Sequence, residues 1–384
     1  MSNIEHPRRA LVPMRVPKRT WQAIGASLLI AAAAACSSSA ARPEATGSAQ
    51  PDTPAASTAP VVVSTRVVCR IVGDSPDAAR AQVRGVDGAP SVVLGGKAYW
   101  FFGDTVRAGP AGRQDVIAAS VARARGVDER GCPQLDFKQT GGTVQPMFAR
   151  REETTAWPGG VLAMDDGSAL FYMVKVTRES PFAWHVSSIG LGRFDPPSME
   201  GVRLSEAIWD ENSGFGSRLA DVRSPVRVGD EVIVYIRTED GANYVGRAPL
   251  ARLGERDAYT YWTGGDWSPR PSDAQPMWPV KPGAVVPADN GVSVTYDELT
   301  KQWLALYTED LARVVVRTAP QPWGPWSAPV TWLECRPLVE DAYPYCYSAE
   351  IHRELSSDPA TAFITFSSQK PYDMTLVELR LAAR

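Results

Sequence analysis

The sequence predicts an all-β protein, a five-bladed β-propeller that follows an export signal and a disordered tether. Three observations support this fold class. Pairs of apolar strands recur about every 65 residues, glycine-containing turns separate the strands of a pair, and helix signals are almost absent.

The N-terminus has the pattern of a lipoprotein signal peptide. Basic residues are followed by an uncharged run from Trp21 to Ala35, and small residues precede Cys36. This order predicts a signal peptide in residues 1–36, lipidation of Cys36 and attachment to the outer side of a bacterial membrane. A spanning helix is the alternative, but an apolar run of about 15 residues is shorter than the roughly 20 that a bilayer requires.

Residues 37–64 are predicted to form a flexible linker, because they are rich in Ser, Ala, Thr and Pro and contain no aromatic residue. Removal of residues 1–36 leaves 35 basic and 42 acidic residues, a net charge of about -7. The basic residues are scattered along the chain and form no stripe. We therefore expect no nucleic-acid partner.

Residues 65–384 are predicted to form one propeller domain, because five hairpins share one plan. They lie at 91–102, 160–174, 224–236, 292–307 and 350–366, and marker residues in them are 70, 63, 71 and 59 residues apart. A further strand follows each hairpin, at 116–123, 186–193, 244–250, 312–318 and 375–381. Such a period suits four-stranded blades joined by long loops.

Turn residues agree with these hairpins. Gly95-Gly96, Asp166-Gly167 and Gly229-Asp230 each lie between two apolar strands. Glycine and aspartate tolerate the positive φ that two-residue hairpin loops require. Each pair is therefore predicted to be a tight turn.

Cysteine use fits an oxidising compartment, since lipidation of Cys36 leaves an even set: Cys69, Cys132, Cys335 and Cys346. Three pairings are possible. The local pairs, Cys69 with Cys132 and Cys335 with Cys346, are favoured because each closes a loop beside a blade. Four free buried thiols are the alternative.

Histidine is scarce, because the mature part contains only His185 and His352. This argues against a histidine-based zinc site and weakens a Ser-His-Asp hydrolase interpretation. No metal or cofactor is expected. The protein is expected to act as a monomer.

The segment from Asp87 to Asp104 is the most informative part of the sequence. If Gly95-Gly96 is a two-residue turn, outward counting places Asp87 opposite Asp104 on one hairpin face. Two close carboxylates repel each other unless one holds a proton or a cation lies between them. A shared proton suits glycoside hydrolysis, which uses one carboxyl as acid and one as base or nucleophile. The alternative is that Asp104 accepts turn hydrogen bonds and Asp87 caps a loop.

Several motifs resemble one protein family. Phe101-Phe102-Gly103-Asp104-Thr105, preceded by Asp87-Gly88, resembles the opening of the family once listed as domain of unknown function 4185 and now as glycoside hydrolase family 183. The similarity extends through Trp323-Gly324-Pro325-Trp326-Ser327 and Ile351-His352-Arg353-Glu354-Leu355. The resemblance implies a five-bladed propeller, endo-D-arabinanase-like activity and catalysis by Asp87 and Asp104. Val106 and Arg353 depart from the family pattern and bear on the substrate.

Polar residues at the starts of the other inner strands are predicted to line the same cleft. They are Trp157, Asp221, Arg223, Asp289, Glu350 and His352. Together they would bind sugar hydroxyl groups, and Trp157 is the leading candidate to stack on a sugar face. For each alone, hydrogen bonding within a loop is the alternative.

Two classes of function remain open at this point. One is a lipoprotein glycoside hydrolase that acts on a furanoside polysaccharide or other cell-wall glycan. The other is a lipoprotein propeller that binds a glycan or protein without turnover, because a fold does not determine a function. A carboxylate pair in the cleft favours the first, whereas a wide separation of the two carboxylates or a buried salt bridge to either aspartate favours the second.

Overall fold

The structure is a computed structural model that describes residues 58–109, 113–149, 151, 153–180, 183–280, 291–339 and 345–384. These residues belong to one compact unit, Pro51–Arg384. The predicted signal peptide, Cys36 and most of the predicted linker lie outside the described residues. The linker prediction extends to residue 64, whereas the first strand, β1, begins at Val61.

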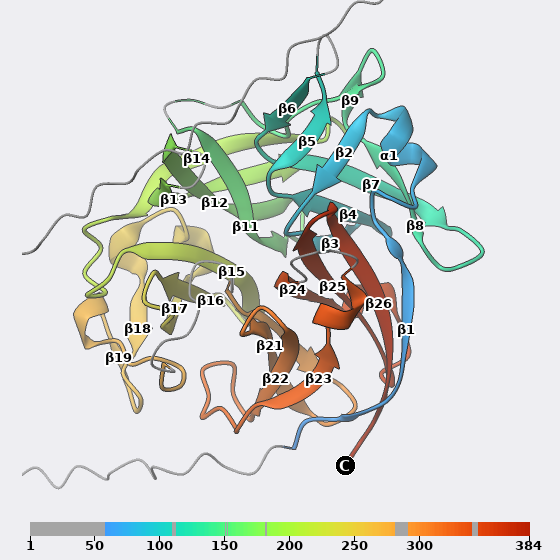
Figure 1. Ribbon diagram of the computed structural model, residues 1–384. Coiled ribbons are helices and arrows are strands. Elements are labelled where there is room, and N and C mark those ends of the chain that lie inside the picture. Colours follow the sequence, from blue (N-terminus) through green and yellow to red (C-terminus); the bar gives the residue numbers. More distant parts are fainter. Residues whose placement is uncertain are drawn as a thin grey trace, which may run out of the picture. The chain divides into compact units, whose positions relative to one another are not determined.

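The described residues form an all-β, β-propeller-like fold whose main sheets are antiparallel (Figure 1). Sheet I contains β3 (Ser91–Leu94), β4 (Lys97–Phe102), β7 (Ser120–Val127) and β8 (Pro133–Phe137). Sheet II contains β11 (Thr155–Ala163), β12 (Ala169–Ser180), β13 (Ala183–Asp195) and β14 (Glu200–Asp210). Sheet III contains β15 (Leu219–Val228), β16 (Glu231–Thr238), β17 (Asn243–Pro249), β18 (Thr260–Trp262) and β19 (Trp267–Ser268).

Sheet IV contains β20 (Ser293–Asp297), β21 (Gln302–Glu309), β22 (Arg313–Ala319) and β23 (Val330–Glu334). Sheet V contains β24 (Cys346–His352), β25 (Thr361–Gln369), β26 (Tyr372–Ala382) and β1 (Val61–Arg70). Two small sheets contain β2 (Val83–Val86), β5 (Thr105–Ala108) and β6 (Gln114–Ile117), and β9 (Gln139–Thr140) and β10 (Thr143–Val144). All five predicted hairpins are present as the first two strands of sheets I to V.

Helical segments are short. Helix α1 spans Pro76–Arg80, and the hydroxyl of Ser75 caps it by accepting a hydrogen bond from the Ala78 amide at 3.2 Å. Five 3₁₀ turns complete the described elements: η2 (Leu250–Arg252), η3 (Arg256–Ala258), η4 (Pro271–Asp273), η5 (Arg336–Leu338) and η6 (Arg353–Leu355).

Hydrophobic clusters lie between neighbouring sheets and close a ring. Tyr99 and Phe101 of β4 pack toward sheet II, while Trp100 and Phe102 pack toward sheet V. Further clusters join sheet II to III, III to IV and IV to V. Because successive strand side chains point to opposite faces, the continuous apolar run in β4 indicates a strand buried on both sides. Full burial of each such side chain contributes about 1.5–3 kcal/mol.

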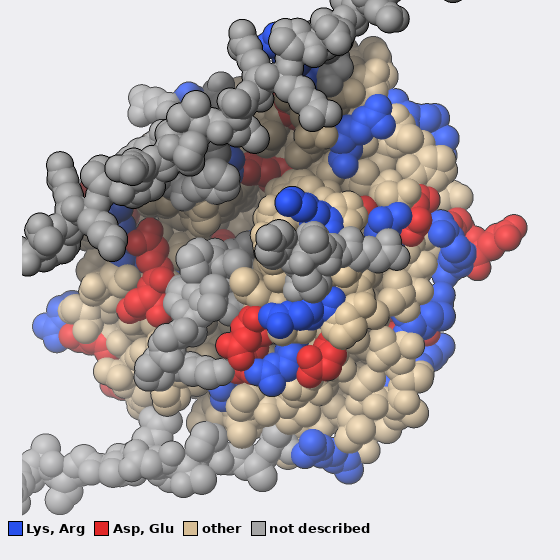
Figure 2. All heavy atoms as spheres, viewed as in Figure 1, with Lys and Arg blue, Asp and Glu red and all other residues tan. Residues whose placement is uncertain are grey.

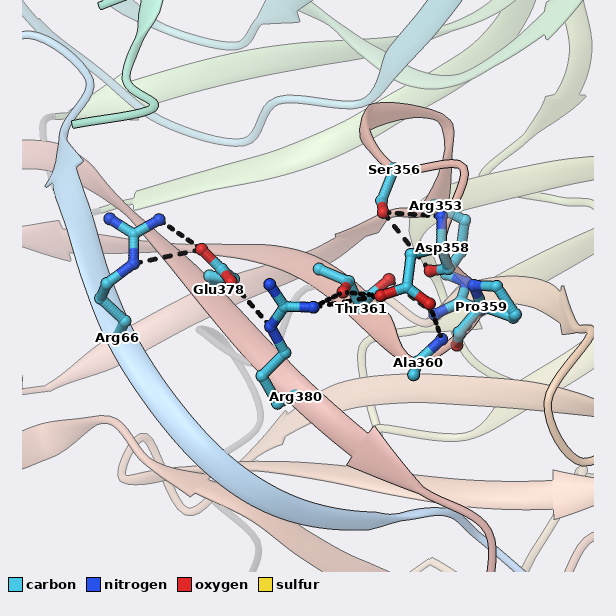
Figure 3. Close-up of polar contacts among 9 residues, drawn as sticks. All are labelled: Arg66, Arg353, Ser356, Asp358, Pro359, Ala360, Thr361, Glu378 and Arg380. Carbon is cyan, nitrogen blue, oxygen red and sulfur yellow. Dashed lines mark hydrogen bonds and ion pairs between the residues drawn. The ribbon is translucent and has the colours of Figure 1, made fainter. Parts of the chain in front are cut away.

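The N-terminal strand β1 completes sheet V by pairing antiparallel with the C-terminal strand β26. A series of polar contacts connects β1 to β26 and to the loop before β25 (Figure 3). Arg66 of β1 forms an ion pair with Glu378, and Glu378 in turn contacts Arg380 at 3.1 Å. Arg380 contacts Asp358 at 3.0 Å. The two ends of the described chain are therefore held in one sheet.

Both favoured disulfides are confirmed. Cys69 is bonded to Cys132 with a Cα–Cα distance of 5.8 Å, and Cys335 to Cys346 with a distance of 6.2 Å. The first bond connects β1 to the loop before β8, and the second connects the end of sheet IV to the start of β24.

Two local predictions differ from the structure. The turn containing Asp166-Gly167 is longer than two residues, because the last pair before it is Ala163 with Ala169. The predicted strand 116–123 is divided between β6 and β7, since Ala119 adopts a positive φ of 29° and interrupts the extended chain.

Candidate active site

The Asp87 and Asp104 side chains originate from directly opposed backbone positions. Ser91 pairs with Trp100 in sheet I, and Val86 pairs with Thr105 in the adjoining small sheet. Four residues separate these pairs on each chain, which sets Asp87 opposite Asp104 as predicted. The Gly103 amide donates a hydrogen bond to the Asp87 carbonyl at 2.8 Å and holds the two segments together.

Asp87 lies in surroundings that favour its protonated form. Burial raises the pKa of its carboxyl to about 6, and the nearby Asp104 charge contributes in the same direction. Hydrogen bonds from Tyr372 and Tyr347 and the charge of Arg223 oppose this rise. The Tyr347 hydroxyl donates to Asp87 Oδ2 at 3.1 Å.

Gly103 leaves the space that the Asp87 carboxyl occupies. A Cβ at residue 103 would lie only 2.7 Å from Asp87 Oδ1. Real Cβ atoms essentially never approach an oxygen so closely, so the glycine of the Gly-Asp-Thr motif has a steric reason.

Asp104 is buried and is held as a hydrogen-bond acceptor. Its Oδ1 accepts hydrogen bonds from the Thr155 hydroxyl and from the Trp157 indole, both at 2.9 Å. Its Oδ2 forms an ion pair with Arg178 of β12. Asp87 and Asp104 thus stand opposite each other but have different partners.

A second charged cluster is centred on Arg223 of β15. Its guanidinium donates to Asp221 at 2.7 Å, to Glu350 at 2.7 Å and to the Ser348 hydroxyl at 3.3 Å. Burial alone would lower the pKa of Arg223, but the two carboxylates raise it above its usual value. Three residues that the sequence placed at one cleft, Asp221, Arg223 and Glu350, are therefore in contact, and they satisfy one another's charges.

Residues with a left-handed backbone conformation lie next to several of these side chains. Gly88, Ser224 and Ser348 adopt φ values of +46°, +44° and +53°. The pairing shifts after Arg223 in β15 and after Tyr347 in β24, as expected at a β-bulge. Each left-handed residue directly follows a residue of the site, and Ser224 and Ser348 lie at the two bulges.

Trp157 contacts a second tryptophan beside Asp104. Its ring lies 5.4 Å from that of Trp184 in β13, in an edge-to-face arrangement. Trp157 remains partly exposed while its indole nitrogen is bound to Asp104. Trp157 and Trp184 form an aromatic wall, and this wall is hydrogen-bonded to Asp104, one of the paired carboxylates.

His352 lies at a junction between sheets I and V. One ring nitrogen contacts the Ser91 hydroxyl at 2.6 Å and the other contacts the Thr365 hydroxyl at 2.8 Å. The ring also packs against Trp100 at 4.7 Å. Both nitrogens are occupied within the protein, so the observed contacts of His352 join the sheets rather than line a cleft.

Asp289 and Cys36 lie outside the described residues. Conversely, the sequence analysis missed Arg178, Tyr347, Tyr372 and Ser348, which contact the site residues. Tyr347 lies only three residues before the predicted Glu350, so its proximity to a predicted inner strand was the available signal. Arg178 gave no local signal, because it reaches Asp104 from a second strand of sheet II.

The fold and the site define a β-propeller-like protein with opposed carboxylates beside an aromatic wall. The chain belongs to the family described as domain of unknown function 4185, which it matches over residues 73–378. Among curated proteins, no sequence matches this chain.

Two solved structures share the fold at low identity. A candidate hydrolase from Bacteroides ovatus is 14% identical, with a TM-score of 0.61, and the match covers 79% of this chain and 87% of that chain. An α-L-arabinofuranosidase from Clostridium thermocellum is 10% identical, with a TM-score of 0.51, and the match covers 77% of this chain and 93% of that chain.

Neither a metal site nor a membrane span is evident in the described ranges. Within them, no group of three or more His, Cys, Asp or Glu side chains is arranged to hold a metal ion. No helix among these residues has the length and apolarity needed to cross a bilayer.

Proposed function

We propose that the protein is an extracytoplasmic lipoprotein glycoside hydrolase that cleaves a furanoside polysaccharide, such as D-arabinan, with Asp87 and Asp104. The opposed pair of carboxyl groups with unlike surroundings is the observation that carries this proposal. The resemblance to glycoside hydrolase family 183 supports the substrate class. The fold shared with an α-L-arabinofuranosidase agrees with it.

In the proposed reaction, Asp87 is the acid. Its pKa of about 6 allows the carboxyl to carry a proton in mildly acidic to neutral solution. That proton passes to the glycosidic oxygen as the bond from this oxygen to the anomeric carbon breaks. Asp87 is left as a carboxylate, which the charge of Arg223 favours.

Asp104 is the acceptor in this scheme. A carboxylate has about four lone-pair positions, and Thr155, Trp157 and Arg178 occupy three of them. Among the residues that the structure describes, none occupies the fourth position. It can receive a proton from a water that attacks the anomeric carbon, or Asp104 can attack this carbon directly.

The five main sheets are proposed to be the five blades, and the carboxyl pair is proposed to face an axial cleft. On the face shown in Figure 2, basic and acidic side chains lie next to one another at several places on the described surface. An uncharged polymer suits such a mixed surface better than nucleic acid, which favours a basic stripe. Polysaccharide is therefore the proposed partner.

The test is incubation of the purified protein with a panel of D-arabinan, other furanosides and pyranosides, followed by product analysis. We expect fragments from a furanoside polymer. Asp87→Asn and Asp104→Asn should each reduce turnover at least about 100-fold while glycan binding is retained. Parent-level turnover in either variant would contradict the paired mechanism.

A second function has one specific observation in its favour. The ion pair between Arg178 and Asp104 is largely buried, with the Asp104 side chain 11% exposed, which suits a structural role for this carboxylate. A glycan-binding or protein-binding propeller without turnover would then be the function. Glycan binding without any product across the panel would support it.

Membrane attachment through lipid on Cys36 is proposed from the N-terminal pattern. In Cys36→Ala the protein should be released in soluble form or remain uncleaved, because the acceptor thiol is absent. Fractionation followed by mass spectrometry of the N-terminus checks this. A processed Cys36→Ala protein that stays in the membrane fraction would contradict it.

A further inference from the structure

A directed chain of hydrogen bonds ends on Asp87. The Gln369 side-chain amide donates to the Tyr347 hydroxyl oxygen at 3.2 Å, and the Tyr347 hydroxyl donates to Asp87 Oδ2 at 3.1 Å. The Tyr347 oxygen accepts from Gln369 and has only one proton to give. That proton is therefore directed at Asp87.

The two oxygens of the Asp87 carboxyl are consequently not equivalent. Oδ2 accepts the Tyr347 hydrogen bond, whereas Oδ1 lies against Gly103. A proton on Oδ2 would have to share that oxygen with the Tyr347 donor. We propose that Tyr347 is a positioning residue that holds the Asp87 carboxyl in one orientation through its hydrogen bond to Oδ2.

The backbone holds Tyr347 and Asp87 in fixed relation. Tyr347 pairs with Ser367 across sheet V, and the Ser367 hydroxyl accepts a hydrogen bond from the Gly88 amide at 3.1 Å. Ser348, with its left-handed backbone, follows Tyr347 at the bulge of β24. The residue next to Asp87 is thus tied to the strand pair that carries the tyrosine.

Tyr347 is suited to act as a permanent donor. Burial raises the pKa of its hydroxyl well above 10, and the Asp87 charge adds to this rise. Tyr347 therefore keeps its proton throughout the pH range in which Asp87 titrates. The other titratable groups that affect the pKa of Asp87 are Asp104, Tyr372 and Arg223, and Tyr372 also donates a hydrogen bond to this carboxyl.

This inference rests on the proposed function for its catalytic meaning, but its first test requires no substrate. Aspartate labelled with ¹³C at Cγ reports the titration of Asp87 in the purified protein, and Asp87→Asn identifies the signal. In Tyr347→Phe we expect the titration midpoint to rise by roughly one pH unit, because a donor to the charged form is lost. Tyr172→Phe is the matched control, since it deletes another buried tyrosine hydroxyl, which contacts Tyr259 at 2.9 Å.

With a furanoside polymer that the parent hydrolyses, Tyr347→Phe should lower kcat about tenfold or more and leave KM nearly unchanged. The alkaline limb of its pH profile should also move upward, because Asp87 then stays protonated to higher pH. A folded Tyr347→Phe with the parent's midpoint and pH profile would overturn the inference, as that result marks a structural hydroxyl.

The two proposals fail separately. A raised midpoint with no hydrolysis of any glycan keeps Tyr347 as the group that positions Asp87 and rejects the proposed function. Hydrolysis with an unchanged midpoint does the reverse. Should Tyr347→Phe fail to fold, Gln369→Leu tests the same chain from an exposed side chain. Its midpoint should rise by a smaller amount, and an unchanged midpoint would reject the directed chain.

Discussion

At the residue scale, the two aspartates of the site lie in different hydrogen-bonding and charge surroundings. Asp87 and Asp104 stand opposite each other, yet tyrosine hydroxyls face Asp87 whereas a guanidinium faces Asp104. The raised pKa of Asp87 follows first from burial and second from the Asp104 charge. Unlike surroundings of two neighbouring carboxyl groups are what distinct acid and acceptor roles require.

The raised pKa of Asp87 also predicts that its charged form lowers the free energy of unfolding near neutral pH. In the unfolded chain Asp87 titrates near 3.8, whereas in the folded protein it titrates near 6. The protonated side chain therefore favours folding below pH about 4, and this contribution is lost as the pH rises through 6. Above that pH the charged carboxyl costs up to about 3 kcal/mol relative to a neutral isostere.

Asp87→Asn should accordingly increase the free energy of unfolding at pH 7–8 and leave it nearly unchanged at pH 3.5. Urea unfolding at both pH values measures the difference. Asp165→Asn is the control, because the Asp165 side chain is 85% exposed and forms an ion pair with Arg227 at 2.8 Å. Equal stability of parent and Asp87→Asn at pH 8 would show that the carboxyl is not strained by its surroundings.

At the element scale, close strand approach positions the site. Gly159 of β11 lies so near β15 that a Cβ on it would stand 2.2 Å from the Val222 carbonyl oxygen. Trp157, two residues before Gly159, belongs to the aromatic wall. Arg223, which follows Val222, is the centre of the charged cluster. The glycine therefore sets the distance between two parts of the site.

Gly159→Ala should destabilise the fold by about 3 kcal/mol or more, because the overlap is with backbone that has no rotamer to change. Thermal and urea unfolding measure this effect. Gly265→Ala serves as the control, since no atom lies within 4 Å of its added Cβ. A Gly159→Ala protein as stable as Gly265→Ala would mean that β11 and β15 can separate at little cost.

At the scale of the whole molecule, the ring of sheets depends on a contact between distant ends of the described chain. Strand β1 pairs with β26, and Val68 and Cys69 of β1 belong to the cluster that joins sheets V and I. Without β1 the outer edge of β26 would lose its backbone partners. Unpaired edges of this kind favour aggregation.

A chain that begins at residue 71 should therefore aggregate or lose cooperative unfolding, whereas a chain that begins at residue 51 should unfold like the full protein. The control is the longer chain with Cys69→Ala and Cys132→Ala, which loses the disulfide but keeps the strand. Size-exclusion chromatography and calorimetry provide the measurements. A monomeric, cooperatively unfolding chain from residue 71 would show that β1 is dispensable.

The local features of this protein can be read from its amino-acid sequence. Paired apolar runs and the Gly95-Gly96 turn predicted the hairpins, since strand length and positive φ are properties of short segments. The same count predicted the opposition of Asp87 and Asp104, because register extends outward from a turn. Local spacing also favoured the two disulfides that the structure contains.

The surroundings of those residues depend on how distant strands pack together. Arg178, Tyr347 and Tyr372 reach the carboxyl pair from other sheets, and β1 joins β26 across more than 300 residues of sequence. No short-range pattern specifies such contacts, because burial and charge at a site depend on how whole sheets pack around it. For the same reason, the sequence did not show that His352 lies at a junction between sheets, where both ring nitrogens have hydroxyl partners.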